Sequence, residues 1–357
     1  MNLDPEFSFP LEMTYKSEEI REKFWKCLYT STGQEMFHYW VLLPQAVKPA
    51  EVKPVHFPEV GLTNIGRYIT EDTSPYMEVW AAYERCQWEM NPSDWLENKL
   101  SLMGEKILHQ RLINHPSGSG KFADVLTIKT LASGDEVVSR YTVQKDYNPV
   151  DGGGNYFLIK ASCAAAIYNS LANDIHFIAI NWDLQHRSNM MLAELLKTVS
   201  LSSKNSSGFK VPDSWQVNVI ADNRLVIEHT FDGVNYGVIN LCFYSQEKYK
   251  TAEEVFQLST SRFHQHDNAV SLTASAMETV QNDINSAFTG DVYTCTGEIV
   301  SAADKVRAFY QMYIVNVEGL WCYAESVGKH RNHQDYYHEA NKRCLEIILS
   351  TLHIENA

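Results

Sequence analysis

Long apolar runs are scarce in this sequence. A helix needs about 20 consecutive apolar residues to cross a bilayer, and the longest candidate near the start, MFHYWVLLP at 36–44, is far shorter. The opening residues, MNLDPEFSFPLEMTYK, also lack a basic region followed by an apolar one, which is the pattern of an export signal. We therefore expect a cytoplasmic protein, or a periplasmic one if the natural chain begins earlier.

Basic residues are in the minority. Lysine and arginine number 30 against 44 aspartate and glutamate residues, which gives a net charge of −14 at pH 7. Affinity for nucleic acid depends mainly on Lys and Arg, so we expect no nucleic-acid binding and, for the same reason, little affinity for membranes with anionic lipids. Without a long apolar run we also expect no direct membrane insertion. With 45% hydrophobic and 21% charged residues the 357-residue chain is expected to fold, and its length favours two domains.

Patterns for disulfides and for cysteine-bound metals are missing. The seven cysteines are odd in number and scattered, and they never form a CxxC pair. This distribution favours reduced, mostly buried thiols over a disulfide framework.

Motifs for nucleophilic or nucleotide chemistry are incomplete. No GxSxG occurs, and GSGKF at 118–122 lacks the full GxxxxGK[ST] pattern and leads into a predicted hairpin strand. The triplet Gly152, Gly153 and Gly154 precedes an apolar strand, NYFLIKA, whereas a phosphate cradle needs a helix N-terminus directly after its glycines. We interpret the triplet as a β-turn, in which glycine supplies a positive φ angle.

Histidines are the best candidates for holding a metal. They occur in RFHQHD and GKHRNHQDYYHE, as His264 and His266 with Asp267, and as His330, His333 and His338 with Glu339. Zinc needs three or four converging ligands, and the sequence has neither HExxH nor a cysteine pair. A solvated connection is favoured, and a metal-dependent hydrolase using the His-rich segment 330–338 is the alternative. We assign no catalytic, cofactor-binding or metal-binding residue.

Breaks in composition predict three parts, namely an N-terminal helical segment with a proline-rich linker (1–58), a first domain (59–200) and a second domain (201–357). Ser17 is placed to cap a helix over EEIREKFWKCLY, and the prolines of 44–59 disfavour helix there. A Ser-, Asn- and Gly-rich stretch at 200–214 separates the domains. The segment SNMMLAELLKTVSL before it is expected to form a further helix.

The two domains repeat one order of predicted elements. Each has a strand, YMEVWAAYERC or GVNYGVINLCFYSQ, and then a helix, capped by Ser93 in the first domain and by Thr251 in the second. A hairpin follows, with its turn at 133–135 or near Asp304. A further strand and a closing helix end each domain. This order predicts an α+β fold, an antiparallel sheet with packed helices.

The second domain opens with VPDSWQVNV and closes with CLEIILSTLHI. Both segments resemble the PsbP/DcrB-like family, whose members begin with a Pro-x-x-Trp-like segment and end in a helix of this type. The residues that carry the resemblance are Pro212, Trp215, Ile347, Ile348, Ser350 and Leu352. A looser resemblance covers 60–185, so the family likeness implies two tandem PsbP/DcrB-like domains.

The resemblance also implies a function. Domains of this type are generally non-catalytic scaffolds or binding modules, and some are similar to accessory proteins and effector chaperones of bacterial type VI secretion. We expect an accessory, adaptor or chaperone without a cofactor, which binds a secretion component or an effector through a sheet face or open edge. A periplasmic organiser of the secretion complex and a homo-oligomer stay open as alternatives.

Overall fold

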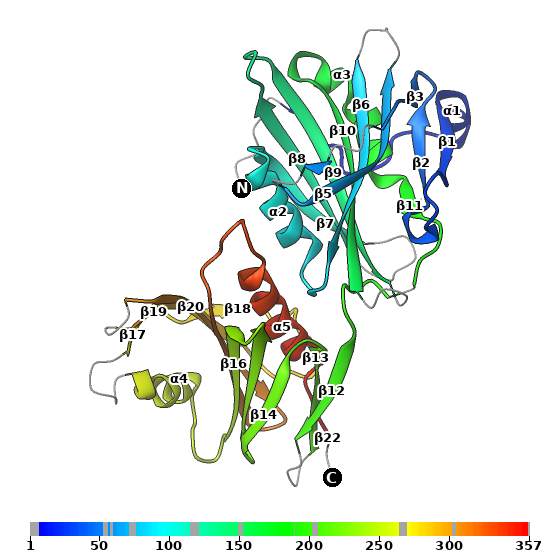
Figure 1. The fold of residues 1–357 in the computed structure, drawn as a ribbon. Coiled ribbons are helices and arrows are strands. Elements are labelled where there is room, and N and C mark those ends of the chain that lie inside the picture. Colours follow the sequence, from blue (N-terminus) through cyan, green and yellow to red (C-terminus); the bar gives the residue numbers. More distant parts are fainter. Residues whose placement is uncertain are drawn as a thin grey trace. The chain divides into compact units, whose positions relative to one another are not determined.

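The computed structural model describes residues 7–52, 56–57, 60–70, 76–114, 121–148, 153–188, 190–201, 206–263, 270–301 and 305–355. The chain forms two compact units (Figure 1). Unit 1 comprises Met1–Gln87 with Asn91–Ala193, and unit 2 comprises Trp88–Met90 with Glu194–Ala357. Each unit combines antiparallel sheets with helices, so the α+β expectation is confirmed.

Unit 1 is built on an eight-stranded sheet. In spatial order its strands are β3 (Val47–Pro49), β5 (Leu62–Thr70), β6 (Met77–Cys86), β10 (Gly153–Ala164), β9 (Glu136–Asn148), β8 (Lys121–Thr130) and β7 (Lys106–Asn114), and β4 (His56–Phe57) also pairs with β5. A three-stranded sheet holds β1 (Phe24–Tyr29), β2 (Tyr39–Pro44) and β11 (Trp182–Leu184). The helices are α1 (Ser17–Lys23), α2 (Pro92–Leu102), α3 (Ala165–Ile180) and the 3-10 turn η1 (Glu35–Phe37).

Unit 2 also has an eight-stranded and a three-stranded sheet. The larger one runs β14 (Gln216–Ala221), β15 (Arg224–Phe231), β16 (Val234–Ser245), β21 (Leu320–Gly328), β20 (Arg307–Val317), β19 (Val292–Ser301) and β17 (Val270–Ala274), and β18 (Glu278–Val280) also pairs with β19. The smaller one holds β12 (Leu196–Leu201), β13 (Ser206–Pro212) and β22 (His353–Glu355). The helices are α4 (Ala252–Thr260), α5 (Tyr337–Thr351) and the 3-10 turn η2 (Ser261–Phe263).

The two units repeat one topology. In unit 1 the hairpin β5–β6 leads to α2, the antiparallel strands β7 to β10 follow, and α3 and β11 close the unit. In unit 2 the hairpin β15–β16 leads to α4, the strands β17 to β21 follow, and α5 and β22 close the unit. The short last strand joins the three-stranded sheet in both cases. The predicted order of strand, helix, strands and helix is therefore confirmed.

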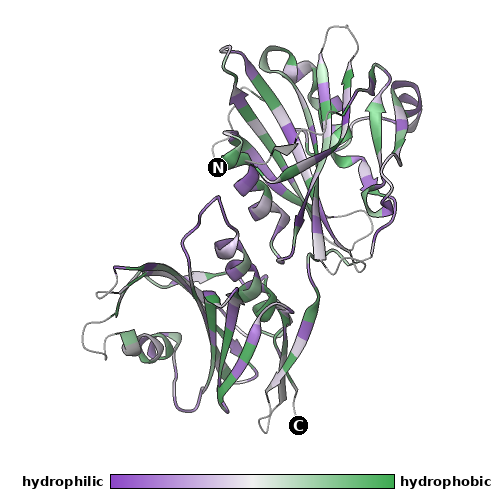
Figure 2. Ribbon diagram, viewed as in Figure 1, coloured by the Kyte–Doolittle hydropathy of each residue, from purple (hydrophilic) through white to green (hydrophobic). Residues whose placement is uncertain are grey.

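Both faces of each large sheet are covered by helices. Along β10, Phe157 and Ile159 share a core with α3, whereas Tyr156 on the opposite face stacks on Trp95 of α2. In unit 2, Cys322 of β21 packs with α5 and its neighbour Tyr323 with α4. Successive side chains of a strand point to opposite faces of the sheet. Because helices cover both faces, the odd-numbered and the even-numbered residues of each central strand must both include apolar side chains. Apolar and polar residues accordingly recur along the same strands in Figure 2.

Several element predictions in the N-terminal part are wrong. The helix predicted from Ser17 over EEIREKFWKCLY ends at Lys23, and the aromatic FWKCLY becomes β1, which pairs with β2 along its whole length. The proline-spaced stretch contributes β3 and β4 to the sheet. In β1, pairing with a neighbouring strand decides the conformation, and local helical spacing does not. The described residues of the proline-spaced stretch form no helix, as predicted.

Other corrections lie near the middle of the chain. The helix expected over SNMMLAELLKTVSL is replaced by β12, in which Thr198 and Val199 are β-branched and Val199 packs on the core of unit 2. The stretch at 200–214 holds much of β13. The closing helix of unit 1, α3, ends at Ile180, and Trp182 lies in β11.

The predicted helix caps have different outcomes. The N-cap of α2 is Asn91, and Ser93 lies inside the helix because Pro92 takes its first position. Thr251 caps α4 as predicted, since its side chain accepts a hydrogen bond from the backbone N–H of Glu254. The turn at 133–135 joins β8 to β9 as expected, and Asp304 lies outside the described residues.

All seven cysteines are buried and free, which confirms the expectation of buried thiols. Among the helices in the described ranges, none has the length and apolar character needed to cross a membrane.

The glycine triplet serves the sheet in a way that the sequence does not reveal. Gly152 lies outside the described residues, while Gly153 and Gly154 begin β10 and pair with β9 without positive φ angles. A side chain on Gly154 would meet the backbone of Ala193, because an added Cβ would lie 2.3 Å from its Cα. The close approach of another chain segment, and not a turn, requires glycine here.

Gly154→Ala should therefore destabilise unit 1 by about 1–3 kcal/mol, since the obstructing atoms are backbone and cannot rotate away. Thermal unfolding followed by circular dichroism measures this loss. Gly33→Ala is the matched control, because a methyl group added there would meet no atom within 4 Å and the φ angle of Gly33 is not positive. Equal melting temperatures for the two variants would contradict this account of Gly154.

Candidate functional site

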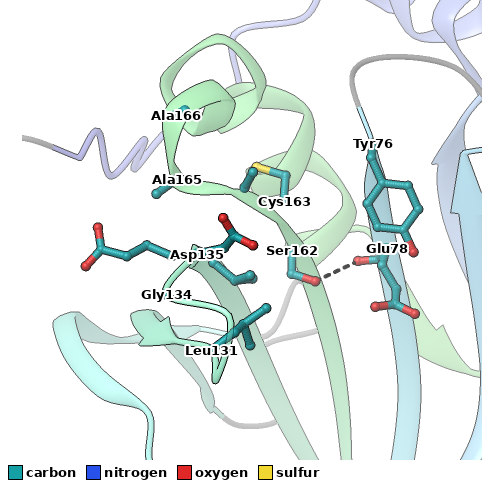
Figure 3. Close-up of a pocket in the computed structure, with 12 residues that line it drawn as sticks. Tyr76, Glu78, Leu131, Gly134, Asp135, Ser162, Cys163, Ala165 and Ala166 are labelled. Carbon is teal, nitrogen blue, oxygen red and sulfur yellow. Dashed lines mark hydrogen bonds between the residues drawn. The ribbon is translucent and has the colours of Figure 1, made fainter.

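A cavity of about 710 Å³ opens in unit 1 where β10 passes into α3 (Figure 3). Its walls come from the start of β6, from the β8–β9 turn and from the junction of β10 with α3. The residues that line it are Tyr76, Glu78, Leu131, Gly134, Asp135, Glu136, Val137, Ser162, Cys163, Ala164, Ala165 and Ala166.

The side chains of this cavity are not arranged for nucleophilic catalysis. The Ser162 hydroxyl donates to the backbone carbonyl of Glu78 at 3.3 Å, so this bond does not connect it to a base (Figure 3). Burial raises the pKa of the Cys163 thiol to about 12, which keeps the sulfur protonated and weakly nucleophilic. The Glu78 carboxylate pairs with Arg67 at 2.7 Å. Neither Ser162 nor Cys163 is therefore activated as a nucleophile in this cavity.

The His-rich segment 330–338 is spread over several environments. The His330 Nε2 atom lies 3.5 Å from a carboxylate oxygen of Glu298, and the His338 ring packs edge-on against Phe309. Glu339 is buried and bound to Arg331 at 2.9 Å. Within the described ranges, no three His, Cys, Asp or Glu side chains gather as metal ligands would.

Other predicted features are placed as follows. His264, His266 and Asp267 lie outside the described residues, as does most of GSGKF. In unit 2, Trp215, Ile348 and Leu352 belong to one hydrophobic core. The residues that carry the family resemblance in this core stabilise the fold and form no exposed site.

A more specific arrangement lies at the N-terminal end of unit 1. Residues 7–15, which we call the strap, form neither helix nor strand, and the chain bends at Phe7 and Glu12. Phe7 is buried and its ring meets Tyr168 edge-on at 5.9 Å. The backbone N–H of Ser8 donates to Oδ1 of Asn169, and the Tyr168 hydroxyl donates to the Ser8 carbonyl, both at 2.9 Å. At the other end, the Tyr15 hydroxyl donates to Asp174.

Two arginines hold the middle of the strap. Nη2 of Arg140 donates to the carbonyl of Pro10, and Nη1 of Arg111 donates to the carbonyl of Leu11, both at 2.9 Å. The ring of Phe9 lies over both guanidinium groups, at 4.3 Å from Arg140 and 5.6 Å from Arg111. Cation–π attraction therefore adds to the hydrogen bonds.

A buried carboxylate positions these arginines. Asp124 accepts hydrogen bonds from Nε and Nη2 of Arg140, both at 2.8 Å, and from Nε of Arg111 at 2.6 Å. Asp124 and Arg140 are both 0% exposed. Nη2 of Arg111 also lies 3.3 Å from Nε2 of His176. Burial, and then the charge of Arg140, lower the pKa of His176 to about 3, so this ring is neutral and accepts the hydrogen bond.

Strand register brings these groups together. Arg111 on β7 stands directly opposite Asp124 on β8, and Arg140 on β9 stands opposite Leu126, two residues along β8. Leu126 belongs to the core under α3, so Asp124 faces the same side of the sheet. α3 supplies Tyr168 and the other side chains that hold the ends of the strap. We call the surface formed by Arg111, Arg140, Tyr168, Asn169 and Asp174 the strap groove.

The strap groove was not predicted from the sequence. Its charged members are spread over three strands and their partners over a helix, so no local motif exists. The sequence carries one signal, because Asp124 in FADVL and Arg140 in SRYTV interrupt apolar strands two residues from Leu126 and Val138, on the side of each strand that faces the core. A charge at such a position must be paired.

The known proteins that are similar to this chain are solved structures. No protein-family model matches the chain, and no curated protein matches it. Among solved structures, it is similar to the Ran-binding protein Mog1p of Saccharomyces cerevisiae, with 12% identity and a TM-score of 0.33 over 44% of this chain and 95% of that one. It is also similar to cyanobacterial PsbP (CyanoP) from Synechocystis sp. PCC 6803, with 11% identity and a TM-score of 0.34 over 44% of this chain and 92% of that one.

The presence of a PsbP protein among these neighbours agrees in part with the resemblance seen in the sequence. At such identities and TM-scores the likeness carries no argument about activity or partners. Neither neighbour links this chain to type VI secretion.

Arg140→Met should destabilise unit 1 by about 3–5 kcal/mol, because it leaves a fully buried carboxylate without its main partner. Urea unfolding of the purified variant measures the loss. Arg67→Met is the control, since its ion pair with Glu78 is partly exposed to solvent and should contribute less than about 1 kcal/mol. A loss at Arg140 as small as the control's would mean that Asp124 finds another partner or water.

His176 should make unit 1 less stable in acid. The unfolded ring takes up a proton near pH 6.5, whereas the folded ring resists protonation down to about pH 3. Stability is therefore fully present above pH 6.5 and falls as the pH is lowered, by about 3 kcal/mol at pH 4. The loss between pH 7 and pH 4, measured by urea unfolding, should be clearly smaller in His176→Gln than in the native chain. An equal loss in both proteins would assign the acid sensitivity to other groups.

Proposed function

We propose that this protein is a non-catalytic binding protein, and that unit 1 holds an extended segment of a partner polypeptide in the strap groove. The observation that carries the proposal is the way in which the strap is held. Side chains of the groove bind its main-chain atoms at Ser8, Pro10 and Leu11, and two aromatic rings, Phe7 and Phe9, anchor it.

Recognition through main-chain atoms suits a peptide ligand. Backbone carbonyls and N–H groups are present in every sequence, so they give affinity, while pockets for alternate side chains give specificity. Phe7 and Phe9 are two residues apart, as expected for the anchors of an extended segment. The strap joins no sheet, so its replacement by another segment would leave the strand pairing of unit 1 intact.

A narrower form of the proposal concerns the biological setting. An accessory, adaptor or chaperone of a type VI-like secretion system would bind an effector or a component of the apparatus in the cytoplasm, or act as an organiser in the periplasm. The support for this setting is the family resemblance at the two ends of the second domain, and it is independent of the strap groove.

Exchange of the strap tests the proposal. A recognition sequence for a specific protease is inserted between Tyr15 and Lys16, where the strap ends and Lys16 is exposed, so that the chain folds with its strap in place and is cut afterwards. A fluorescent peptide with the sequence FSFPLEMTY is then added, and its binding is followed by anisotropy. We expect binding to the cut protein and little binding to the uncut one, because the tethered strap competes at high effective concentration.

A peptide in which Phe7 and Phe9 are both replaced by alanine is the control. Loss of the buried Phe7 ring and the partly buried Phe9 ring should weaken binding by at least about tenfold, since an aromatic anchor contributes on the order of 2 kcal/mol. If the cut protein keeps its circular dichroism spectrum, releases its own strap and still takes up no FSFPLEMTY peptide, the strap groove is not a peptide site.

A further inference from the structure

We infer that the partner segment bound in the strap groove carries an acidic side chain beside its aromatic anchors. This inference rests on the proposed function and specifies the chemistry of the ligand. It predicts a segment in which a carboxylate stands next to Arg140, close to the position of Ser8 or Pro10 in the strap.

The charge balance under the strap favours an anion. Asp124 carries one negative charge and is shared by two guanidinium groups, those of Arg140 and Arg111. The triplet therefore has a net positive charge, although Asp124 and Arg140 are both fully buried. The surplus charge belongs to Arg111, whose side chain is 22% exposed, so solvent screens it only in part and a further negative group in contact with the triplet would be stabilising.

The groups packed around the triplet do not supply that anion. His176 is neutral, and His109 stacks on the Phe9 ring on the side of β7. Asp174 lies further along α3 and accepts the hydrogen bond from Tyr15. The strap has an acidic residue of its own, Glu12, but it is exposed to solvent.

The strap itself satisfies the arginines only with neutral groups. It offers the carbonyl oxygens of Pro10 and Leu11 and the ring of Phe9. Hydrogen bonds from arginine to a carboxylate are shorter and roughly twice as strong as those between neutral groups. A carboxylate in this position would therefore bind more tightly than the strap's carbonyls do.

An incompletely used donor points to the same kind of ligand. Nη1 of Arg140 is buried and makes no hydrogen bond to any of the described residues. It belongs to the guanidinium whose Nη2 binds Pro10, so it lies beside the middle of the strap. A buried donor left unpaired costs free energy, and a ligand oxygen that reaches it would recover this cost.

The surplus charge and the unpaired donor together explain how a partner could displace a segment that is covalently attached. The strap has the advantage of its tether, whereas an acidic partner segment has the advantage of pairing the surplus charge. Competition between them would make unit 1 respond to acidic, aromatic segments and ignore others.

The test uses the cut protein described above and five peptides: FSFPLEMTY itself, its Ser8→Asp and Pro10→Asp variants, and the matched Ser8→Asn and Pro10→Asn variants. Aspartate and asparagine have nearly the same shape, so each pair isolates the charge. We expect at least one aspartate peptide to bind about tenfold or more tightly than its asparagine counterpart, as measured by anisotropy. The advantage should disappear in Arg111→Met, whose arginine is partly exposed and less critical for folding than Arg140.

The outcomes are distinct. If FSFPLEMTY binds and neither aspartate peptide surpasses its asparagine counterpart, the acidic preference is overturned and the proposed function stands. The Arg111→Met protein is first shown by circular dichroism to be folded. If the aspartate peptides keep their full advantage over the asparagine peptides in this variant, the peptide carboxylate acts at another place and the inference is likewise overturned. If no peptide binds, the proposed function fails and this inference fails with it.

Discussion

The ion pair between Asp124 and Arg140 constrains the whole N-terminal part of unit 1. Both residues lie in the interior, where an unpaired charge would cost several kcal/mol. The carboxylate is satisfied by Arg140 and Arg111 together, and the arginines in turn require acceptors on their outer side. The strap supplies these acceptors. An extended segment that pairs with no strand is thereby fixed to the sheet and to α3.

The repeated topology makes the location of this ion pair informative. Both units place a long helix on one face of a large sheet, with α3 and α5 in the same position in the order of elements. In the described part of unit 2, however, no arginine is buried, although α5 carries the buried Glu339 and its partly exposed Arg343 pairs with the buried Glu89. The shared order of elements therefore does not require two arginines around one buried aspartate, since the described part of unit 2 has this order without buried arginines. Burying the charges of Asp124 and Arg140 is costly. Their presence in unit 1 is more readily explained by the binding of the strap or a similar segment than by the needs of the shared fold.

Much of the architecture could be predicted from the sequence, because strand alternation and helix spacing are local signals. The strands β6 and β16, the hairpin turn at 133–135 and the cap at Thr251 were all predicted correctly. Errors occurred where tertiary pairing decides the conformation, as in β1 and β12. The role of Gly154 was also hidden, since it depends on the approach of Ala193, which is distant in the sequence. The strap groove could not be predicted for a related reason. Arg111, Asp124 and Arg140 meet only when β7, β8 and β9 pair in the observed register, and a shift of one residue would turn Asp124 to the opposite face of the sheet.

The way in which the strap is held also determines how it could leave. Its contacts with the arginines are hydrogen bonds from guanidinium groups to carbonyl oxygens, which water can replace once the groove opens. Neither of the two hydrogen bonds between Asp124 and Arg140 involves a strap atom, so departure of the strap removes neither bonding partner. Opening therefore costs the burial of Phe7 and Phe9 but does not break the ion pair. The triplet of Asp124, Arg140 and Arg111 lies in the sheet, and the strap is attached to it only through aromatic rings and neutral carbonyl acceptors. This arrangement suits the exchange of one extended segment for another.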